Sequence, residues 1–456
     1  LGGGPGGYSA AIRARQLGLR VILVEKEKLG GICLNWGCIP TKALLGNAEI
    51  WQLLGEVESR GIRVDGASFD WGKVIANSRE VAGKLSTGID YLMKKNGVEI
   101  RNGLGRISPL GHVEVVDCEG EKSGDIQSEH IIISTGSKPR SVPGIDIDGE
   151  LVLSSRNAME LTSCPKSMVI IGGGAIGVEF AYFFNAFGCA VTLLESENHL
   201  LPREDPEVAN LLEDLFNKKG IEIKTGVSVK GVELMGDSAR LTYSSREQEK
   251  TLSAEKILMA VGVEGLSSGL GLEALGVRKN GDTIQVNERQ QTSVVGIWAI
   301  GDVAGAPQLA HAAVAEGIAA VEFIVGRERS PVNRRNIPSC VYSQPQIAST
   351  GLSEADALNQ GVEVKIGRFP FEASGRAQAS GSTDGFVKLI FEAEYGELLG
   401  GTIIGNGATE LIAEVALAIN MEATYEELMW TVHAHPTLSE MVMEAAGAAF
   451  DEAINI

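Results

Sequence analysis

Residues 2–25 read GGGPGGYSAAIRARQLGLRVILVE, and residues 172–195 read GGGAIGVEFAYFFNAFGCAVTLLE. In each stretch a G-x-G-x-x-G turn opens a helical segment, a later glycine closes it, and a hydrophobic run ends in glutamate. Glu25 and Glu195 stand at the same distance from the first glycine of their copy, and a β-strand pattern at 167–171 precedes the second copy. This strand–turn–helix–strand pattern indicates a Rossmann-like domain that binds a dinucleotide, and its repetition predicts two of them.

The glycines of such a turn have separate tasks. The first makes the tight turn, the second lets a pyrophosphate approach the backbone, and the third lets the helix pack on the strand. The closing glutamate accepts hydrogen bonds from a ribose 2′-hydroxyl and would repel a 2′-phosphate. We therefore expect two dinucleotides without that phosphate; the alternative is a pair of glycine turns that hold no ligand. The residues assigned to cofactor binding are Gly2, Gly4, Gly7, Glu25, Gly172, Gly174, Gly177 and Glu195.

The two copies also divide the chain. We expect an α/β fold in which a first domain is split between residues 1–145 and 265–335, and residues 146–264 form an inserted domain. Residues 336–456 alternate strand and helix patterns without a glycine-rich turn, which predicts a C-terminal α+β domain. No strand pattern precedes Gly2, so we expect the printed chain to be a fragment that lacks the first strand.

Composition excludes some functions. The chain has 456 residues with 40 Lys and Arg against 59 Asp and Glu, a net charge of −19. That charge argues against partners rich in phosphate, namely nucleic acids and anionic membranes. No uncharged apolar run is long enough to cross a membrane. Six cysteines are too few for a disulfide scaffold, and we expect a reducing compartment: the cytoplasm, or the mitochondrial matrix or a plastid in a eukaryote.

One cysteine pair stands apart, in the stretch GGICLNWGCIPTK of residues 30–42. Pro40 is well placed as the first residue of a helix. A thiol just before a helix N-terminus has a lowered pKa, and the thiols of Cys33 and Cys38 could form a reducible disulfide. A metal site or two structural cysteines are the alternatives. Next to two dinucleotide sites, the pair favours an electron relay through a flavin, because a nicotinamide does not readily exchange electrons with a disulfide.

Two further segments carry candidate residues. Asp302 follows a strand pattern, where it suits a polyol hydroxyl or caps the next helix. That helix, expected from about His311 to Gly326, would aim its N-terminal dipole at negative charge on a reduced flavin. Near the C-terminus, TVHAHPTLSE at 431–440 supplies His435 as a base and Glu440 as the carboxylate that orients it. Half a metal site, shared with His433, or a structural histidine are the alternatives.

Five motifs together resemble the flavin-dependent disulfide oxidoreductases, and most closely the dihydrolipoamide dehydrogenase family. They are GGICLNWGCIPTKALL (30–45), GGGAIGVEFA (172–181), AIGDVAGAPQLAHAAVAEG (299–317), IPSCVYSQPQIASTGL (337–352) and HAHPTLSE (433–440). The resemblance implies FAD in the split domain, NAD in the inserted domain and dimerisation through the C-terminal domain. It implies oxidation of protein-bound dihydrolipoamide to lipoamide with reduction of NAD⁺. The implied partners are the lipoyl domain and subunit-binding segment of a 2-oxoacid dehydrogenase complex, or the lipoyl protein of glycine cleavage.

The same resemblance implies a role for each matching residue. Cys33 and Cys38 would form the redox-active disulfide, with Cys38 against the flavin and Cys33 facing substrate. Lys42 would lie by the flavin ring and pair with Glu179. The remaining roles are Asp302 on the ribityl chain, Gly262 and Ala310 at the cofactors, and His435 with Glu440 acting on Cys33 of the partner subunit. The turn at 262–265 reads Gly-Val-Glu-Gly where a Gly-Arg-x-Pro-like turn is usual, so no further contact is carried over there.

Related families fit less well. Glutathione-type reductases use NADPH and would want basic residues after the second strand, where this chain has Glu195 and Glu197. Mercuric-type and large thioredoxin reductases carry an extra C-terminal cysteine pair, and soluble transhydrogenases lack the pair at 33 and 38. A flavoprotein that only binds its cofactors is the alternative from another class. The presence of both cysteines, Lys42 and the His–Glu pair argues against it.

Overall fold

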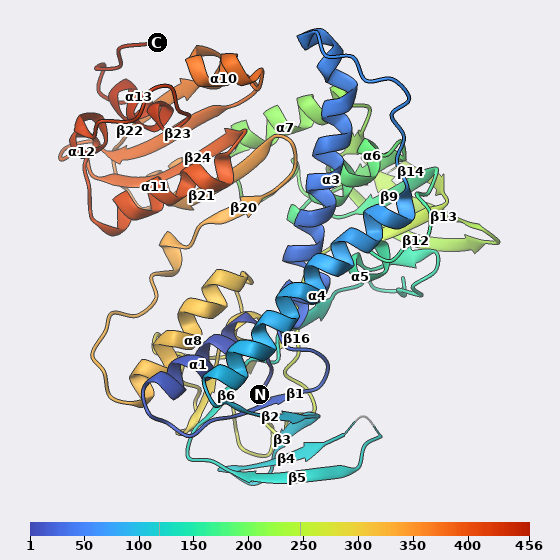
Figure 1. The fold of residues 1–456 in the computed structure, drawn as a ribbon, viewed down its shortest axis with the longest axis vertical. Coiled ribbons are helices and arrows are strands. Elements are labelled where there is room, and N and C mark those ends of the chain that lie inside the picture. The colour runs from blue at the N-terminus through green and yellow to red at the C-terminus, as the bar shows by residue number, and fades with distance from the viewer. Residues whose placement is uncertain (118, 247) are drawn as a thin grey trace.

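The computed structural model describes residues 1–117, 119–246 and 248–456, so Cys118 lies outside the described residues. Figure 1 shows three bodies: the split domain at the bottom, the inserted domain at the right and the C-terminal domain at the upper left. The mixed α/β architecture agrees with the fold class predicted from the sequence. Within the described residues, no helix is both long and apolar enough to cross a membrane.

The inserted domain is built on a parallel sheet. Its elements are β8 (Val152–Leu153), α5 (Ser155–Ala158), β9 (Ser167–Ile171), α6 (Ala175–Ala186), β10 (Ala190–Leu194), α7 (Pro206–Lys218), β11 (Glu222–Lys224), β12 (Val227–Met235), β13 (Ser238–Ser245), β14 (Gln248–Ala254) and β15 (Lys256–Met259). The strand order is β11-β10-β9-β15-β8, and every pair in it is parallel. An antiparallel sheet of β12, β13 and β14 lies beside it. The predicted strand at 167–171 is β9, and the second glycine turn joins it to α6.

The split domain contains the first glycine turn. Its N-terminal elements are α1 (Pro5–Gln16), β1 (Ile22–Glu25), α2 (Gly31–Trp36), α3 (Cys38–Glu56), η1 (Val57–Arg60), α4 (Trp71–Lys95), β2 (Glu99–Asn102), β3 (Leu104–Ile107), β4 (His112–Val116), β5 (Lys122–Gln127), β6 (Ile131–Ile133) and β7 (Ser137–Pro139). Its later elements are β16 (Val263–Gly265), β17 (Lys279–Asn280), β18 (Thr283–Ile284), β19 (Ile297–Ala299), η2 (Gly301–Ala304) and α8 (Ala310–Ile324). The pairs β1–β2 and β6–β19 are parallel, and β3, β4 and β5 form an antiparallel sheet.

The first residues join the two parallel pairs of the split domain. The Gly2 N–H donates to the Val24 carbonyl in β1 at 2.8 Å, and the Leu1 carbonyl accepts from the Ser134 N–H, just after β6, at 2.7 Å. Helices α1 and α8 pack closely because Gly6 and Gly317 face each other. A Cβ on Gly317 would lie 2.6 Å from the Gly6 carbonyl oxygen. The two halves of the split domain therefore meet at the helix that follows the first turn.

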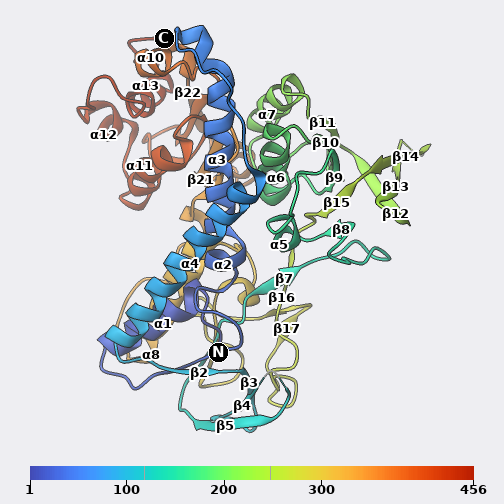
Figure 2. The same ribbon diagram turned by 45° about the vertical axis from the view of Figure 1, so that its right-hand side comes forward.

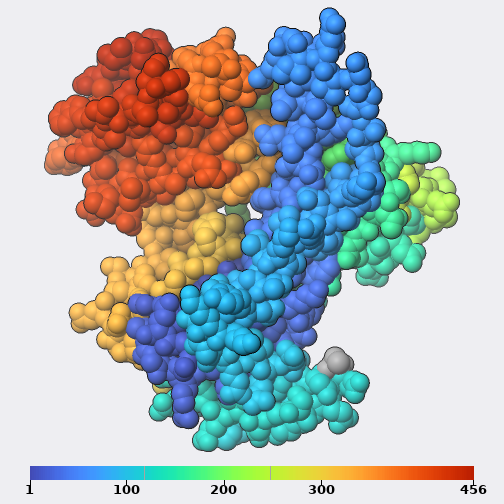
Figure 3. Space-filling view, viewed as in Figure 1, coloured from blue at the N-terminus to red at the C-terminus, as the bar shows by residue number. Residues whose placement is uncertain are grey.

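Helices α3 and α4 connect the bodies. In both views the two helices leave the split domain together (Figures 1 and 2). Helix α3 passes beside the C-terminal domain, whereas the other end of α4 lies next to the inserted domain, where Trp71 packs against Phe183 and Phe184. On the face drawn in Figure 3 the two helices separate the C-terminal residues from the inserted domain. Helix α3 buries Leu44, Leu45 and Ala48 in the same hydrophobic core as the aromatic side chains of α6, among them Phe180 and Phe184. This packing brings Lys42 of α3 next to Glu179 of α6.

The C-terminal domain is an antiparallel sheet covered by helices. Its elements are η3 (Arg334–Asn336), β20 (Ser339–Val341), β21 (Gln346–Gly351), α9 (Glu354–Asn359), β22 (Val364–Pro370), η4 (Phe371–Ala373), α10 (Gly375–Ser380), β23 (Phe386–Glu392), β24 (Leu398–Gly405), α11 (Ala408–Asn420), α12 (Tyr425–Trp430) and α13 (Glu440–Ala448). The strand order is β20-β21-β24-β23-β22. Helix α13 lies so close to β22 that a Cβ on Gly367 would be 1.8 Å from the Ala445 carbonyl oxygen.

Candidate active site

The two glycine turns have the same geometry. The first glycine of each is in the left-handed region, with φ of +100° at Gly2 and +108° at Gly172. A Cβ on Gly172 would lie 2.3 Å from the Ala260 carbonyl oxygen. A Cβ on the third glycine, Gly7 or Gly177, would lie 1.9 Å from the carbonyl oxygen of the first. Backbone conformation and close packing therefore require glycine at both of these positions.

Nothing within the protein requires glycine at the second glycine position of each turn. Gly4 and Gly174 have ordinary extended backbones, with φ of −69° and −74°. A Cβ on Gly174 would meet nothing within 4 Å, and one on Gly4 would meet only the Gly31 Cα at 4.0 Å. The space left open lies at the N-terminus of α1 or α6, where a phosphate is favoured. Both turns thus leave room for a group outside the chain, as a bound dinucleotide requires.

The glutamates that close the two copies also occupy equivalent places. Glu25 Oε2 accepts from the Gly3 N–H and Glu195 Oε2 accepts from the Gly173 N–H, both at 2.6 Å. The other oxygen of Glu195 accepts from the Ser196 hydroxyl and the Glu197 N–H. These bonds hold each carboxylate beside its turn. A negative charge fixed there suits a free ribose hydroxyl and disfavours a 2′-phosphate.

The cysteine pair lies where α2 gives way to α3. Cys33 is on α2, and Cys38 is the first residue of α3; both are free thiols. The sequence predicted that Pro40 is the first residue of the helix. In the structure it is the third. Proline is tolerated there because the first-turn N–H groups have no partner within a helix.

The two thiols differ in acidity. A hydrogen bond from the Cys33 thiol lowers the pKa of Cys38, and the positive charge of Lys42 lowers it further against the effect of burial. The same hydrogen bond, together with burial, raises the pKa of Cys33. The position of Cys38 at the N-terminus of α3 adds to this asymmetry. The pair therefore favours a thiolate at Cys38 and a protonated thiol at Cys33.

Lys42 and Glu179 form the expected ion pair. The Lys42 ammonium lies 2.9 Å from Glu179 Oε1 and 3.0 Å from Oε2, and the Glu179 side chain is only 6% exposed. Tyr342, just after β20, donates its N–H to Glu179 Oε1 at 3.0 Å, and its ring lies 4.4 Å from the ammonium. The split, inserted and C-terminal domains thus all contribute to this pair. Since Cys38 and Lys42 are four residues apart, they lie on one face of α3.

Asp302 lies in the short helix η2 and not at the start of a long helix. Its Oδ2 accepts from the Ser137 hydroxyl at 2.6 Å, and burial raises its pKa. Two residues that the sequence did not single out hold this turn. Glu316, 2% exposed, accepts from the Gly301 N–H at 2.8 Å and pairs with Arg334 at 2.8 Å. Their separation along the chain gave no local pattern from which this arrangement could be predicted.

A cavity of about 620 Å³ lies between the inserted domain and the split domain. Gly262, Ala304 and Gln308 line it, and Arg203 lines it from the loop before α7. Ala310, the first residue of α8, follows two positions after Gln308. The turn containing Gly262 and the segment that leads into α8 thus adjoin the same cavity.

The two histidines near the C-terminus have different surroundings. The His433 side chain is 6% exposed, and its Nε2 lies 2.6 Å from Glu414 Oε1, so its ring is held within its own domain. The His435 side chain is 78% exposed, and its Nδ1 lies 2.9 Å from Glu440 Oε1. Glu440 is fixed in turn by the Thr437 N–H at 2.8 Å. Although burial opposes its ionisation, that hydrogen bond and His435 hold the pKa of Glu440 below its usual range.

The structure does not bring His435 to the cysteines of its own chain. His435 lies between α12 and α13 at the upper left of Figure 2, whereas Cys33 lies on α2, which Figure 2 shows near the middle of the molecule. Among the described residues, His435 Nε2 has no hydrogen-bond partner. An exposed imidazole held by a carboxylate on its Nδ1 is able to act on a group outside its own chain.

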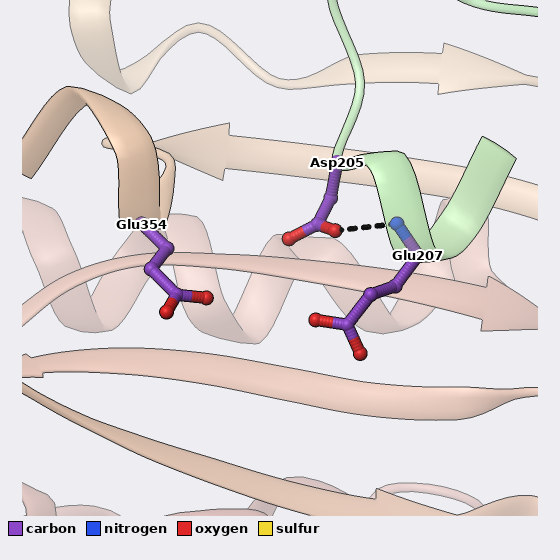
Figure 4. Close-up of side chains that lie close together, drawn as sticks. All are labelled: Asp205, Glu207 and Glu354. Atoms are coloured by element: carbon purple, nitrogen blue, oxygen red, sulfur yellow. Dashed lines mark hydrogen bonds between the residues drawn. The ribbon is translucent and has the colours of Figure 1, made fainter. Parts of the chain in front are cut away.

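A group of carboxylates has the spacing of a metal site. Asp205, Glu207 and Glu354 place one oxygen each within 4.8 Å of the others (Figure 4). The ammonium of Lys388, however, lies 2.7, 2.8 and 2.7 Å from these three side chains. A cation is therefore already supplied by the chain itself.

Comparison with known proteins identifies the family. The sequence profile described as pyridine nucleotide-disulphide oxidoreductase matches residues 1–317, and the dimerisation domain of the same family matches residues 337–446. The chain belongs to the pyridine nucleotide-disulphide oxidoreductase family. Its C-terminal domain is therefore a dimerisation domain, and the resemblance inferred from the five motifs is confirmed.

Individual members of the family are similar over almost the whole chain. The dihydrolipoyl dehydrogenases of Chlorobaculum parvum and Bacillus subtilis are 45% and 43% identical, over 98% and 100% of this chain and 96% and 98% of theirs. The solved structure of LpdA from Mycobacterium tuberculosis has a TM-score of 0.92 at 27% identity and covers 98% of both chains. Family members of this kind use FAD and NAD, in agreement with the two open glycine turns.

Proposed function

We propose that this chain is a dihydrolipoyl dehydrogenase that oxidises protein-bound dihydrolipoamide to lipoamide and reduces NAD⁺ to NADH. The observation that carries the proposal is the asymmetric thiol pair at the start of α3. Cys38 favours the thiolate and lies on the same helix face as Lys42, whose ion pair with Glu179 links it to the inserted domain. FAD bound in the split domain would supply a two-electron acceptor between this dithiol and NAD⁺.

The thiol chemistry follows from the residues present. In the oxidised enzyme Cys33 and Cys38 are joined, and a dihydrolipoyl thiolate attacks the Cys33 sulfur while Cys38 leaves as the thiolate. His435 of the partner subunit takes the proton of the attacking thiol, and Glu440 holds that imidazole. The second substrate sulfur then attacks the first, closes the lipoyl ring and releases Cys33, which takes up a proton. Two sulfur–sulfur bonds have been exchanged, and the electron pair rests on the protein dithiol.

The other residues support this step. Lys42 stabilises the negative charge of Cys38, since its ammonium lowers the pKa of that thiol. Asp302 would hold a hydroxyl of the flavin's ribityl chain. Gly2, Gly4 and Gly7 would receive one pyrophosphate, and Gly172, Gly174 and Gly177 the other. Glu25 and Glu195 would bind the free ribose hydroxyls.

We propose that the partner is the lipoyl domain of a 2-oxoacid dehydrogenase complex or of a glycine-cleavage system, bound by a homodimer. The net charge of −19 suits a basic subunit-binding segment of such a complex. Binding of that segment should weaken as salt is added, because exposed charges are screened. We place the enzyme in the cytoplasm, because six cysteines are too few for a disulfide scaffold and a reducing compartment suits free thiols such as Cys164, Cys189 and Cys340.

The experiment is a substrate comparison on the flavin-loaded enzyme. We expect reduction of NAD⁺ by dihydrolipoamide, and no comparable reaction with NADP⁺, glutathione or mercuric ion. Glu195→Ala should narrow the preference for NAD⁺ over NADP⁺ because it removes the charge that repels a 2′-phosphate. A wild-type enzyme that prefers NADP⁺, or that reduces glutathione disulfide faster than lipoamide, would contradict the proposal.

A further inference from the structure

The loop between the inserted sheet and α7 is bound to the second glycine turn. The Leu201 N–H donates to the Gly173 carbonyl at 2.8 Å, and the Leu200 side chain is so close that a Cβ on Gly173 would lie 2.6 Å from it. Leu201 is left-handed, with φ of +50°, a conformation that leucine adopts only when its surroundings hold it there. Two residues later, Arg203 lines the cavity that Gly262 and Gln308 also line.

The first glycine turn shows what this loop corresponds to. There the Gly30 N–H donates to the Gly3 carbonyl, also at 2.8 Å, and the Leu29 side chain packs against Gly3. Gly30 is left-handed as well, with φ of +92°. In the first copy the chain continues from this point to Cys33, the thiol that meets substrate. Segment 200–205 therefore occupies, beside the NAD turn, the place that the redox segment occupies beside the FAD turn.

The end of this segment is fastened to another domain. Asp205, 8% exposed, caps α7 by accepting from the Glu207 N–H and pairs with Lys388 of β23 at 2.7 Å. Lys388 is 1% exposed. Burial alone would lower the pKa of its ammonium, but the hydrogen bonds to its carboxylate partners outweigh burial and raise that pKa. Glu354, the partner shown with Asp205 in Figure 4, belongs to the same domain as the lysine.

We propose that Lys388 is a positioning residue for the NAD site: by holding Asp205, it fixes segment 200–205 as one wall of that site. The inference rests on the proposed function in one respect, that NAD binds at the second glycine turn. The Lys388 ammonium pairs with carboxylates of the chain, and it acts through the segment that presents Arg203 to the cavity. A buried charge serves this purpose because its pairing energy is lost if the carboxylate moves away.

Two isosteric variants test the inference. Asp205→Asn keeps a good helix cap but removes the charge that binds the loop to Lys388. Glu354→Gln removes one charge from the same ammonium without touching the loop. We expect Asp205→Asn to raise the dissociation constant of NADH and the KM for NAD⁺ about tenfold, with kcat and the KM for dihydrolipoamide within about twofold of wild type. Glu354→Gln should leave all four values near wild type.

Other outcomes would overturn the inference. Unchanged NADH affinity in Asp205→Asn, or an equal loss in Glu354→Gln, would show that the lysine does not position the loop. Lys388→Met should reproduce the loss of NADH affinity; if it does not fold, Asp205→Asn alone decides. NADH binding is measured by equilibrium dialysis on the flavin-loaded enzyme, which does not need dihydrolipoamide turnover. A wild-type enzyme that binds NADH but does not oxidise dihydrolipoamide would refute the proposed function and leave this test intact.

Discussion

At the scale of single residues, the glycines of the two turns separate folding from binding. Gly172 is required by its backbone conformation and by the Ala260 carbonyl, whereas Gly174 has an ordinary backbone and open space before it. The same contrast holds between Gly2 and Gly4. Replacing Gly172 or Gly174 by alanine adds the same methyl group. A comparison of the two variants therefore isolates the effect of the surroundings of each glycine.

We expect Gly174→Ala to fold as well as wild type, with stability unchanged or raised by about 0.4–1 kcal/mol, because alanine restricts the unfolded chain. Its NADH affinity should fall about tenfold or more, because the methyl group fills the space left for the pyrophosphate. The matched control, Gly172→Ala, should lose about 3 kcal/mol or more of stability. Thermal unfolding and NADH titration measure the two effects. Equal destabilisation by both variants would contradict this assignment.

The two cysteines have the same side chain, and their surroundings give their thiols different pKa values. In enzyme reduced by two electrons, a Cys38 thiolate beside the flavin should give a long-wavelength charge-transfer band. Cys33→Ser should keep such a band and Cys38→Ser should lose it. Because the pKa of Cys38 is lowered, the band should persist as pH falls below the usual range of thiols, about 8–9, and disappear only at lower pH. A band that survives in Cys38→Ser would reverse the roles of the two thiols.

At the scale of elements, α3 carries both the reactive thiol and its charged neighbour. Its packing against α6 brings Lys42 to Glu179, and the start of the helix places Cys38 at its N-terminus. Neither residue could reach its partner if the helix were shifted by one residue. The acidity of the thiol is thus set by the position of a whole element.

Lys42→Met should therefore change both stability and acidity. It leaves the buried Glu179 carboxylate without its cation, and we expect a loss of about 3 kcal/mol in the free energy of unfolding. It also removes a charge that lowers the pKa of Cys38, so the charge-transfer band should disappear at a higher pH than in wild type. Lys73→Met, which removes an exposed lysine paired with Asp70, should change neither value. Chemical denaturation and a pH titration of the reduced enzyme check both.

Features that lie within one short segment could be predicted from the sequence, whereas contacts between distant segments could not. The glycine turns, their closing glutamates and the strand before the second turn lie within short segments, so spacing alone predicts them. The cysteine pair also lies within one short segment, but the helix begins two residues earlier than Pro40 suggested, because a first turn accepts proline at several positions. Glu316 and Lys388 could not be predicted, because their partners are brought to them only by the packing of distant segments.

At the scale of the whole molecule, the proposed site needs residues from two chains. The exposed His435 and its carboxylate lie in the dimerisation domain, away from α2, the helix that carries Cys33 in the same chain. Pairing of two copies about a twofold axis would supply each cysteine pair with a histidine from the other copy. Lys388 belongs to the same domain. In the proposed relay this domain therefore contributes both to the thiol site and to the NAD site.

Hybrid dimers test this arrangement. A dimer of one Cys33→Ser chain and one His435→Gln chain should have about half the dihydrolipoamide activity of wild type, because one of its two sites keeps both residues. Each variant alone should lose most of its activity, while His433→Gln should mainly reduce stability through loss of its contact with Glu414. Differently tagged chains, purified as the hybrid, provide the sample. An inactive hybrid would show that cysteine and histidine act within one chain.

The matching hydrogen bonds of Gly30 and Leu201 show that the internal duplication continues beyond the stretches whose sequences are similar. Sequence alignment of the two copies ends at their glutamates, but the backbone register continues through one inserted residue to the next turn. The two copies diverge only after Gly30 and Leu201. The first continues into α2, which carries Cys33, and the second continues into Pro202 and Arg203. The same backbone hydrogen bond thus starts two segments with different tasks, one that carries the thiol Cys33 and one that carries Arg203 to the cavity.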